Sequence, residues 1–303
     1  ELNLKEVRLT MGRTKNFSEE IEKQAIFNYV EKKQGLAAAG REFGITQYMM
    51  EKILKKYGIA KRTYTEAKQQ GRKYPCNDDF FKIQTADMGY ILGFIAADGY
   101  ISAKENCVSI EILQQDKDIL FQIAEKMDVS RPITLQTRNN GCKTATLRNW
   151  SMSWKQDLSH YGIINNKTFT LKPPTLLLPK YRIDFIRGYF DGDGSISTTK
   201  AKNGKGIIYN KNSFEIVGAS KYEMDWIREE LINHYHIILN KPGHYTTENG
   251  TIVYKIITTD KKQIQKIYNL FYNTESSLYL NRKKEKFETI LNIPRDSNSS
   301  IEE

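Results

Sequence analysis

Two aspartates, Asp98 and Asp193, each close a copy of the same short pattern in the sequence. The copies are MGYILGFIAADG at residues 88–99 and FIRGYFDGDG at residues 185–194. Gly93 aligns with Gly188, and in both copies the final acid follows this glycine by five residues. The two acids are separated by the length of a small domain. The repetition therefore predicts two equivalent units that each contribute one carboxylate.

Each copy has the composition of an apolar helix that ends at its Asp-Gly. Glycines four residues apart, Gly89 and Gly93 in one copy and Gly188 and Gly192 in the other, leave one face of each helix without side chains. Such faces allow two backbones to pack closely, and the natural partner of each copy is the other copy. The glycine after each aspartate can take the left-handed conformation that ends a helix. We therefore expect both carboxylates at the same end of one helix pair.

Two carboxylates at the negative ends of two helix dipoles are suited to binding Mg²⁺. This ion takes one or two protein carboxylates and keeps its other positions for water and phosphate. Such a pair is a plausible centre for phosphodiester cleavage. One apolar helix that ends in Asp-Gly is usually a core helix followed by a turn. The prediction of a cleavage centre therefore depends on the presence of two matching copies.

The paired segments resemble the signature motifs of the LAGLIDADG homing endonucleases in their two-motif, single-chain form, over residues 85–293. The resemblance implies an α+β fold, in which two LAGLIDADG units form a pseudo-twofold tandem repeat with saddle-shaped antiparallel sheets. It also implies that the last acid of each motif is the catalytic metal ligand, which carries over to Asp98 and Asp193. The earlier acid is Asp191 in the second copy and is replaced by Ala96 in the first. This departure argues against a catalytic role for Asp191.

The resemblance further implies hydrolysis of both strands of a long, asymmetric duplex DNA target, with short 3′ overhangs. Mg²⁺ would be held by both aspartates and by the backbone carbonyls of Ala97 and Gly192. Mn²⁺ is expected to substitute for it, and Ca²⁺ is expected to bind without supporting cleavage.

The family also places a basic residue near each centre, where it polarises water or offsets charge on the phosphorane. Lys167 and Lys283 are the candidates here, with Arg282 and Lys284 as alternatives for the second. Gln114 and Lys221 follow the strands that border the site and are candidates to orient the attacking water. A solvated lysine or glutamine is the ordinary interpretation of each of these residues taken singly.

The composition agrees with a nucleic-acid enzyme. Lys and Arg total 46 against 36 Asp and Glu, a formal net charge of +10, which favours a polyanionic partner. No stretch approaches the roughly 18 apolar residues of a membrane span. The three cysteines, Cys76, Cys107 and Cys142, lack the close spacing of zinc or redox motifs. We expect a soluble, cytoplasmic, nucleoid-associated protein with no membrane partner, and an organelle matrix stays open as an alternative.

The segment before the first repeat predicts a small helical module. Ser18 opens an expected helix, and residues 35–59 have the pattern of a short helix, a tight turn at Gly44 and a second helix capped by Thr46. This pattern resembles the helix-turn-helix of many DNA-binding proteins, whose second helix enters the major groove, although an ordinary helical hairpin would share it. The residues expected to contact DNA are Gln47, Tyr48, Glu51, Lys52 and Lys55.

The predicted organisation has five parts. They are a helix-turn-helix module at 11–60, a basic linker at 61–84, the first LAGLIDADG repeat at 85–180, the second repeat at 181–293 and a flexible tail at 294–303. The ten residues before Met11 are set apart from this interpretation. In the linker, Arg62, Arg72 and Lys73 could contact phosphates, although a solvated tether has the same composition.

After each motif the chain repeats the order strand, helix and hairpin. The strands are expected at 107–113 and 213–220, and the hairpins turn at Asn140-Gly141 and Asn249-Gly250. In the family the concave faces of such sheets read the major groove. The candidate contacts are Ser109, Glu111, Arg138, Lys143, Arg148, Lys205, Tyr209, Lys211 and Lys255. The solvated face of a half-buried sheet would present similar residues.

The two halves differ in nearly every strand residue, which predicts an asymmetric target and a chain that acts as a monomer. The ends lack the Cys or Ser start and the His-Asn finish of a self-splicing element, so a free-standing enzyme encoded by an intron or a phage is favoured. Three alternatives stay open. They are an RNA maturase that binds intron RNA and assists splicing, a non-catalytic transcription regulator on the same fold, and a structural DNA-binding protein.

Overall fold

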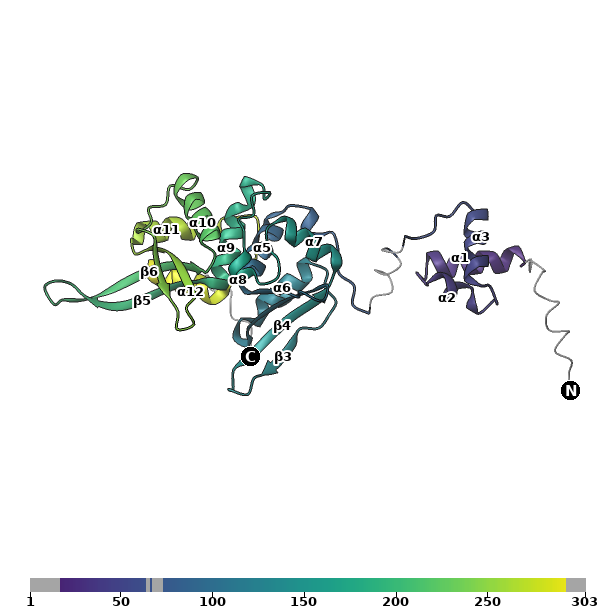
Figure 1. Ribbon diagram of the computed structural model, residues 1–303, viewed down its shortest axis with the longest axis horizontal. Helices are drawn as coiled ribbons and strands as arrows, with labels where there is room; N and C mark the ends of the chain where they lie inside the picture. The colour runs from purple at the N-terminus through teal and green to yellow at the C-terminus, as the bar shows by residue number, and fades with distance from the viewer. Residues whose placement is uncertain (1–16, 64–65, 67–72, 293–303) are drawn as a thin grey trace. The chain divides into compact units, whose positions relative to one another are not determined.

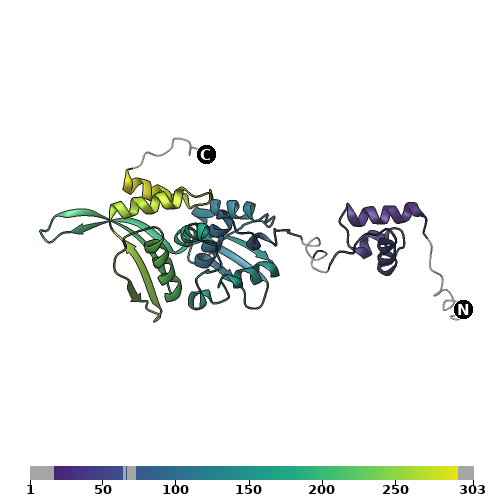
Figure 2. The same ribbon diagram turned by 90° about the horizontal axis from the view of Figure 1, so that it is seen from above.

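The computed structural model describes residues 17–63, 66 and 73–292, and the chain divides into two compact units between Pro75 and Cys76 (Figures 1 and 2). This boundary lies within the segment predicted as a linker. The predicted tail, the first ten residues and Arg72 lie outside the described residues. No helix in the described part of the chain has both the length and the apolar character that crossing a membrane requires.

The N-terminal unit is a three-helix module. Its helices are α1 Glu19–Val30, α2 Leu36–Arg41 and α3 Gln47–Lys56. Ser18 and Thr46 accept hydrogen bonds from backbone amides of α1 and α3 at 3.4 and 3.3 Å, so both act as N-caps. Gly44 makes the turn between α2 and α3 with a φ of +68°, which a glycine adopts without strain. The helix, turn and helix expected at residues 35–59 are present.

The second unit contains two four-stranded antiparallel sheets with the same strand order. The first runs β1 Gly99–Ile101, β2 Cys107–Leu113, β4 Lys143–Trp150 and β3 Thr134–Thr137. The second runs β5 Gly194–Lys202, β6 Ile208–Gly218, β8 Ile252–Thr258 and β7 Gly243–Thr246. Both predicted hairpins are present, turning at Gly141 and Gly250 with φ of +79°. The predicted α+β fold with a tandem repeat is confirmed.

Helices pack on one face of each sheet and between the repeats (Figure 1). They are α5 Ala86–Asp98, α6 Lys117–Lys126, α7 Met152–His160, α8 Lys167–Thr170, α9 Arg182–Asp193, α10 Lys221–Asn233, α11 Lys261–Tyr272 and α12 Asn281–Leu291. Helices α5 and α9, one from each repeat, lie side by side at the centre, and one apolar core extends through both repeats.

The predicted linker ends earlier than residue 84. Residues 76–84 belong to the second unit, where Phe81 is buried and packs edge-on against Trp154 at 5.9 Å. Asp78 is also buried and accepts a hydrogen bond from Ser151. The basic, weakly periodic composition of the segment did not reveal this end of it, which Phe81 and Asp78 anchor to the second unit.

Candidate active site

Helices α5 and α9 touch through their glycines. A β-carbon on Gly93 would lie 2.0 Å from the carbonyl oxygen of Phe185, and one on Gly188 would lie 2.0 Å from that of Tyr90. A β-carbon on Gly192 would lie 2.3 Å from the Ala97 side chain. The close backbone approach predicted from the glycine spacing is therefore present, and the C-terminal ends of both helices lie together.

The glycines after the two aspartates do not take the predicted left-handed conformation. Gly99 has a φ of −74° and Gly194 has a φ of −100°, because a β-strand begins at each glycine without an intervening turn. A side chain would still not fit, since a β-carbon would lie 2.5 Å from the Ile95 carbonyl oxygen in one copy and 2.2 Å from the Phe190 ring in the other.

The two aspartates at these helix ends share one electrostatic environment. Burial and, to a smaller extent, the negative charge of Asp193 raise the pKa of Asp98 to about 6, while the charges of Lys167 and Lys283 oppose the shift. Burial also raises the pKa of Asp193 against the same two lysines. Both carboxylates are thus disfavoured in their charged forms, and a bound cation would relieve that cost.

Two lysines in equivalent positions cap the two helices. The Lys167 ammonium donates to the carbonyls of Ala96, at 2.9 Å, and Ala97. A cation here neutralises the negative end of α5 and satisfies carbonyls that the helix leaves unpaired. Burial lowers the pKa of Lys167, and the charges of both aspartates oppose that effect.

Lys283 performs the same function at α9, but with all of its donors used. Its ammonium donates to the carbonyls of Phe190 at 2.5 Å and of Asp191 and Gly194, both at 2.7 Å. A lysine has three N–H donors, so none is left for water or phosphate. Burial lowers the pKa of Lys283 to about 8. The structure therefore makes Lys283 a residue that positions Asp193, whereas Lys167 keeps one donor.

The donor set fits a divalent cation that takes few protein ligands. Among the residues that the structure describes, no three His, Cys, Asp or Glu side chains converge as a metal site. Two carboxylates with water and phosphate oxygens suit Mg²⁺, whereas a structural zinc site needs more protein donors. The Ala97 carbonyl, a predicted ligand, already accepts a hydrogen bond from Lys167. Lys283 instead binds the carbonyls of Asp191 and Gly194, on either side of the Gly192 carbonyl.

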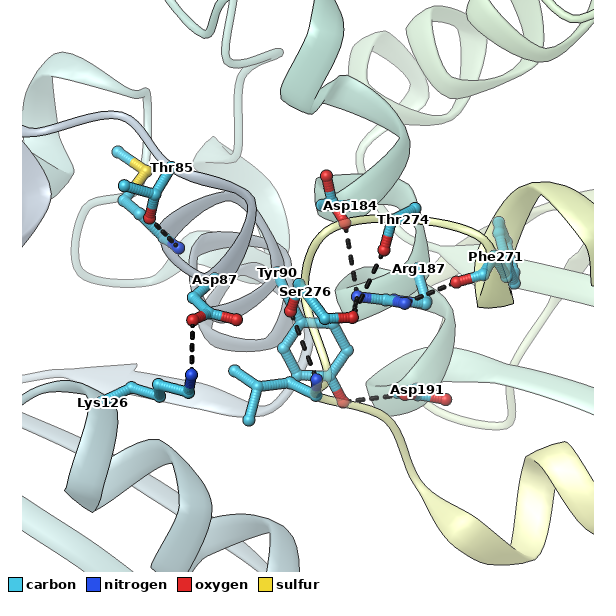
Figure 3. Close-up of polar contacts among 12 residues, drawn as sticks. Thr85, Asp87, Tyr90, Lys126, Asp184, Arg187, Asp191, Phe271, Thr274 and Ser276 are labelled. Carbon is cyan, nitrogen blue, oxygen red and sulfur yellow. Dashed lines mark hydrogen bonds and ion pairs between the residues drawn. The ribbon is translucent and has the colours of Figure 1, made fainter.

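Asp191 joins the two repeats. It is 1% exposed and accepts a hydrogen bond from the Tyr90 hydroxyl of α5 at 2.7 Å (Figure 3). It also accepts a hydrogen bond from the Leu280 amide at 2.9 Å. Burial raises its pKa, and the charge of Lys283 opposes that shift. These contacts agree with the sequence interpretation that Asp191 is not catalytic.

A buried arginine reinforces the same region of α9. The Arg187 guanidinium donates to the carbonyls of Phe271 and Ser276, the latter at 3.1 Å, and contacts Asp184 at 3.3 Å (Figure 3). Burial raises the pKa of Asp184 to about 6, and it outweighs the opposing charge of Arg187. The network fixes α9 against the loop that leads to α12.

One ion pair beside Asp98 was not predicted as a pair. Arg282 of the second repeat donates through Nε to both carboxylate oxygens of Asp116 in the first repeat, at 2.8 Å each. Asp98, Asp116 and Arg282 line a cavity of about 300 Å³. Arg282 was an alternative basic candidate, but nothing in the sequence connects it to an acid 166 residues away.

The two residues proposed to orient water differ in their surroundings. Lys221 is exposed and forms an ion pair at 2.5 Å with Asp225, one turn along α10, so the structure does not support its predicted role. Gln114 lines a hollow with Leu113, Gln115 and Lys143, and Leu113 also lines the cavity beside Asp98.

The DNA-contact candidates of the first sheet differ in their exposure and in their contacts with other side chains. Ser109 pairs with Arg148, and both alternate with the core residues onto the face opposite the helices. Ser109 is 6% exposed, however, which leaves it little surface for DNA, while Arg148 is exposed. Glu111 and Arg138 form an ion pair with each other. Lys143 is exposed at the end of β4.

The candidates of the second sheet are more accessible. Tyr209 and Lys211 are exposed near the start of β6, and Lys205 lies in the turn between β5 and β6. Lys255 is half-buried, because it forms an ion pair with Glu215 at 3.0 Å.

The N-terminal candidates lie on α3. Gln47, Tyr48, Lys52 and Lys55 are exposed, and the Lys52 ammonium lies 4.6 Å from the centre of the Tyr48 ring. Glu51 binds Lys61 at 2.5 Å.

Arg62 has an internal role that the sequence did not reveal. Its guanidinium donates to the carbonyls of Tyr29, Lys33 and Gln34 and stacks on the Tyr29 ring at 3.7 Å. It caps α1, and this contradicts the predicted phosphate contact. Lys73 is exposed.

Residues 180–271 match the family model described as the LAGLIDADG-like domain. The span includes Asp193 and the whole second sheet. This part of the chain is therefore similar to LAGLIDADG-like domains. The match supports the family resemblance inferred from the motif at residues 185–194, whereas the DNA-binding role of the N-terminal helices stays a prediction.

Solved structures of LAGLIDADG proteins are also similar to this chain. The homing endonuclease I-WcaI bound to its DNA recognition sequence is 19% identical, with a TM-score of 0.45, over 69% of this chain and 90% of that one. The I-LtrWI LAGLIDADG homing endonuclease bound to target DNA is 13% identical, with a TM-score of 0.45, over 71% of this chain and 91% of that one. Among curated protein sequences, none matches this chain.

Proposed function

We propose that this protein is a DNA endonuclease that hydrolyses both strands of a long, asymmetric duplex target and leaves short 3′ overhangs. The observation that carries the proposal is the meeting of two helix ends, one from each repeat, each with an aspartate whose pKa burial raises. Each repeat supplies one acid, so one chain contains a complete centre and acts as a monomer.

Asp98 and Asp193 would hold a divalent cation, with Mg²⁺ as the natural ion, Mn²⁺ as a substitute and Ca²⁺ as an ion that binds without supporting cleavage. When bound, such an ion polarises a phosphate oxygen and lowers the pKa of a coordinated water. The remaining donor of Lys167 is available to a phosphate oxygen, where it would stabilise developing negative charge. Lys283 keeps the end of α9, and therefore Asp193, in position.

The distribution of charge and packing supports DNA as the substrate. The chain carries a net charge of +10, and the sheet face opposite the helices bears exposed polar and basic side chains such as Arg148 and Lys211. The exposed residues of α3 would add contacts from the N-terminal unit.

Two other functions on the same fold make different predictions. A non-catalytic transcription regulator has no need of two half-buried aspartates at meeting helix ends, where the charge of Asp193 disfavours ionisation of Asp98, so the pair counts against it. An RNA maturase would bind intron RNA, and competition between duplex DNA and structured RNA would reveal it.

The test is selection of cleaved sites from a randomised duplex library in Mg²⁺. The wild type should yield one asymmetric site, and Asp98→Asn and Asp193→Asn should each abolish cutting while DNA binding stays within about threefold. Asp118→Asn, at an exposed acid of α6, is the matched control and should cut normally. Binding without cutting by the wild type, or normal cutting by either active-site variant, would overturn the proposal.

A further inference from the structure

One ion pair joins the two repeats beside Asp98. Arg282, at the start of α12, donates through Nε to both carboxylate oxygens of Asp116 at 2.8 Å. Asp116 lies between β2 and α6 of the first repeat, and its side chain is 8% exposed. A carboxylate withdrawn from water loses hydration free energy, which only a well-placed cation returns. Asp116 therefore depends on a partner from the other repeat.

The side chain of Asp116 does not do what an acid at its position ordinarily does. Asp116 is the N-cap residue of α6, where a carboxylate normally accepts hydrogen bonds from the first backbone amides, yet it accepts none of them. The N-cap of the equivalent helix α10, Ser220, does accept such a bond from the amide of Glu223 at 3.4 Å. The carboxylate of Asp116 thus serves the contact between the repeats and not the helix that it begins.

Arg282 keeps most of its donors free. Asp116 uses only Nε, and within the described part of the chain neither Nη nitrogen of Arg282 has an acceptor. The guanidinium lines the cavity of about 300 Å³ that Asp98 also lines, whereas Asp193 does not line it. A planar guanidinium held at one edge presents its remaining N–H groups in a fixed direction, an arrangement suited to phosphate oxygens.

This pair has no counterpart on the other side of the centre. Arg282 directly precedes one of the two capping lysines, and Asn166 directly precedes the other. Asp116 and Ser220 are equivalent as the N-caps of α6 and α10. The positions that mirror the ion pair therefore hold two uncharged residues, and only one half of the centre has a guanidinium held by the opposite repeat.

We propose that Asp116 is a positioning residue that holds the Arg282 guanidinium beside Asp98, where its free N–H groups bind the phosphate group of one DNA strand during cleavage. This inference rests on the proposed function. The first repeat thereby fixes a phosphate-binding group that belongs to the second repeat. The strand that meets Arg282 is cut faster than the other, because the guanidinium stabilises the negative charge that develops on its phosphate group.

The test measures the cleavage rate of each strand separately. The selected duplex carries a label on one strand or the other, and the enzyme is in saturating excess, so that each rate describes a single turnover of bound DNA. The variants are Asp116→Asn, Arg282→Gln and the double variant D116N/R282Q. Asp116→Asn keeps the size of the side chain and removes the charge that orients the guanidinium. Asp118→Asn, at an exposed acid of α6, is the matched control.

The wild type and the control should cut one strand faster than the other. Asp116→Asn should slow that strand by about tenfold, through misplacement of Arg282, while the rate on the other strand and the DNA affinity stay within about threefold. Arg282→Gln should slow the same strand by about 10²-fold, because a charge-stabilising donor is lost. The double variant should be no slower than Arg282→Gln, since Asp116 acts only through Arg282.

A pair that only joins the repeats would give different results. Asp116→Asn would then lower the denaturation midpoint and slow both strands equally, and this outcome would overturn the inference. Additive slowing in the double variant, or wild-type rates on both strands in Asp116→Asn and Arg282→Gln, would also overturn it and leave the proposed function standing. Absence of cutting by the wild type would reject both proposals.

Discussion

At the scale of single residues, the two capping lysines occupy equivalent positions but differ in how many of their N–H donors are already used in hydrogen bonds. Lys167 uses two of its three donors and Lys283 uses all three. The sequence predicted both lysines as catalytic, because spacing from a motif shows which residues arrive near a site. It does not show how many donors the nearby carbonyls consume.

Because of this difference, we expect substitution of Lys167 to lower the cleavage rate and substitution of Lys283 to lower the stability of the fold. Lys167→Met should slow single-turnover cleavage by about 10²-fold or more, since one charge-stabilising donor contributes on that scale. Lys283→Met should lower the free energy of unfolding by about 1–3 kcal/mol, because buried carbonyls lose their donors. Rates with preformed complex and urea denaturation measure the two effects. The assignment is wrong if Lys283→Met is as stable as the wild type and only its rate falls.

Glu223 predicts a pH dependence of stability. It is 0% exposed on α10, neither carboxylate oxygen has a hydrogen-bond partner, and burial raises its pKa from 4.5 to about 8. The folded state therefore holds a proton that the unfolded chain releases above pH 4.5. The contribution of this group is fully present below pH 4.5 and is lost as pH rises to about 8.

Replacing the carboxyl group of Glu223 should remove this loss of stability at high pH. Glu223→Gln should be more stable than the wild type at pH 8, on the order of a few kcal/mol, and the gain should vanish near pH 4. Denaturant midpoints across pH provide the measurement. Glu229→Gln, at an exposed glutamate of the same helix, is the control and should follow the wild type. A constant difference at every pH would show that ionisation is not the cause.

At the scale of elements, the contact between α5 and α9 is the most sensitive feature. A β-carbon on Gly188 would lie 2.0 Å from a backbone oxygen of the other repeat, so the helices must separate to admit it. Gly188→Ala should cost about 3 kcal/mol of stability and also reduce cutting, because the aspartates move apart.

Gly243→Ala is the matched control for that substitution. Nothing lies within 4 Å of a β-carbon at Gly243, so thermal unfolding should change little. Equal melting temperatures for the two variants would contradict tight packing at the helix crossing.

Elements with a strong local pattern were predicted from the sequence, and elements defined by tertiary contacts were not. The motif helices, both hairpin turns and the caps at Ser18 and Thr46 follow from local periodicity and turn residues. Strand β5 was missed because its Ser-, Thr- and Lys-rich sequence has no apolar alternation. The Arg282–Asp116 pair was missed because only folding brings the two repeats together.

At the scale of the whole molecule, the N-terminal unit is a separate contributor to binding. It has its own core and a helix with exposed basic and polar residues, so its contacts should add to those of the repeats. Deleting residues 11–60 should weaken binding by at least tenfold and shorten the footprint, while cutting at saturation persists. Electrophoretic titration and footprinting measure both quantities. An unchanged footprint would reject a DNA-binding role for these helices.

The central claim is that one carboxylate from each repeat serves a single metal centre, and Mn²⁺ binding to the complex with target DNA tests it most directly. Electron paramagnetic resonance should show bound Mn²⁺ in the wild type and in Asp118→Asn. The same spectra should show its loss in Asp98→Asn and equally in Asp193→Asn. Retention of the bound ion in one of these two variants and its loss in the other would mean that the aspartates do not share a centre.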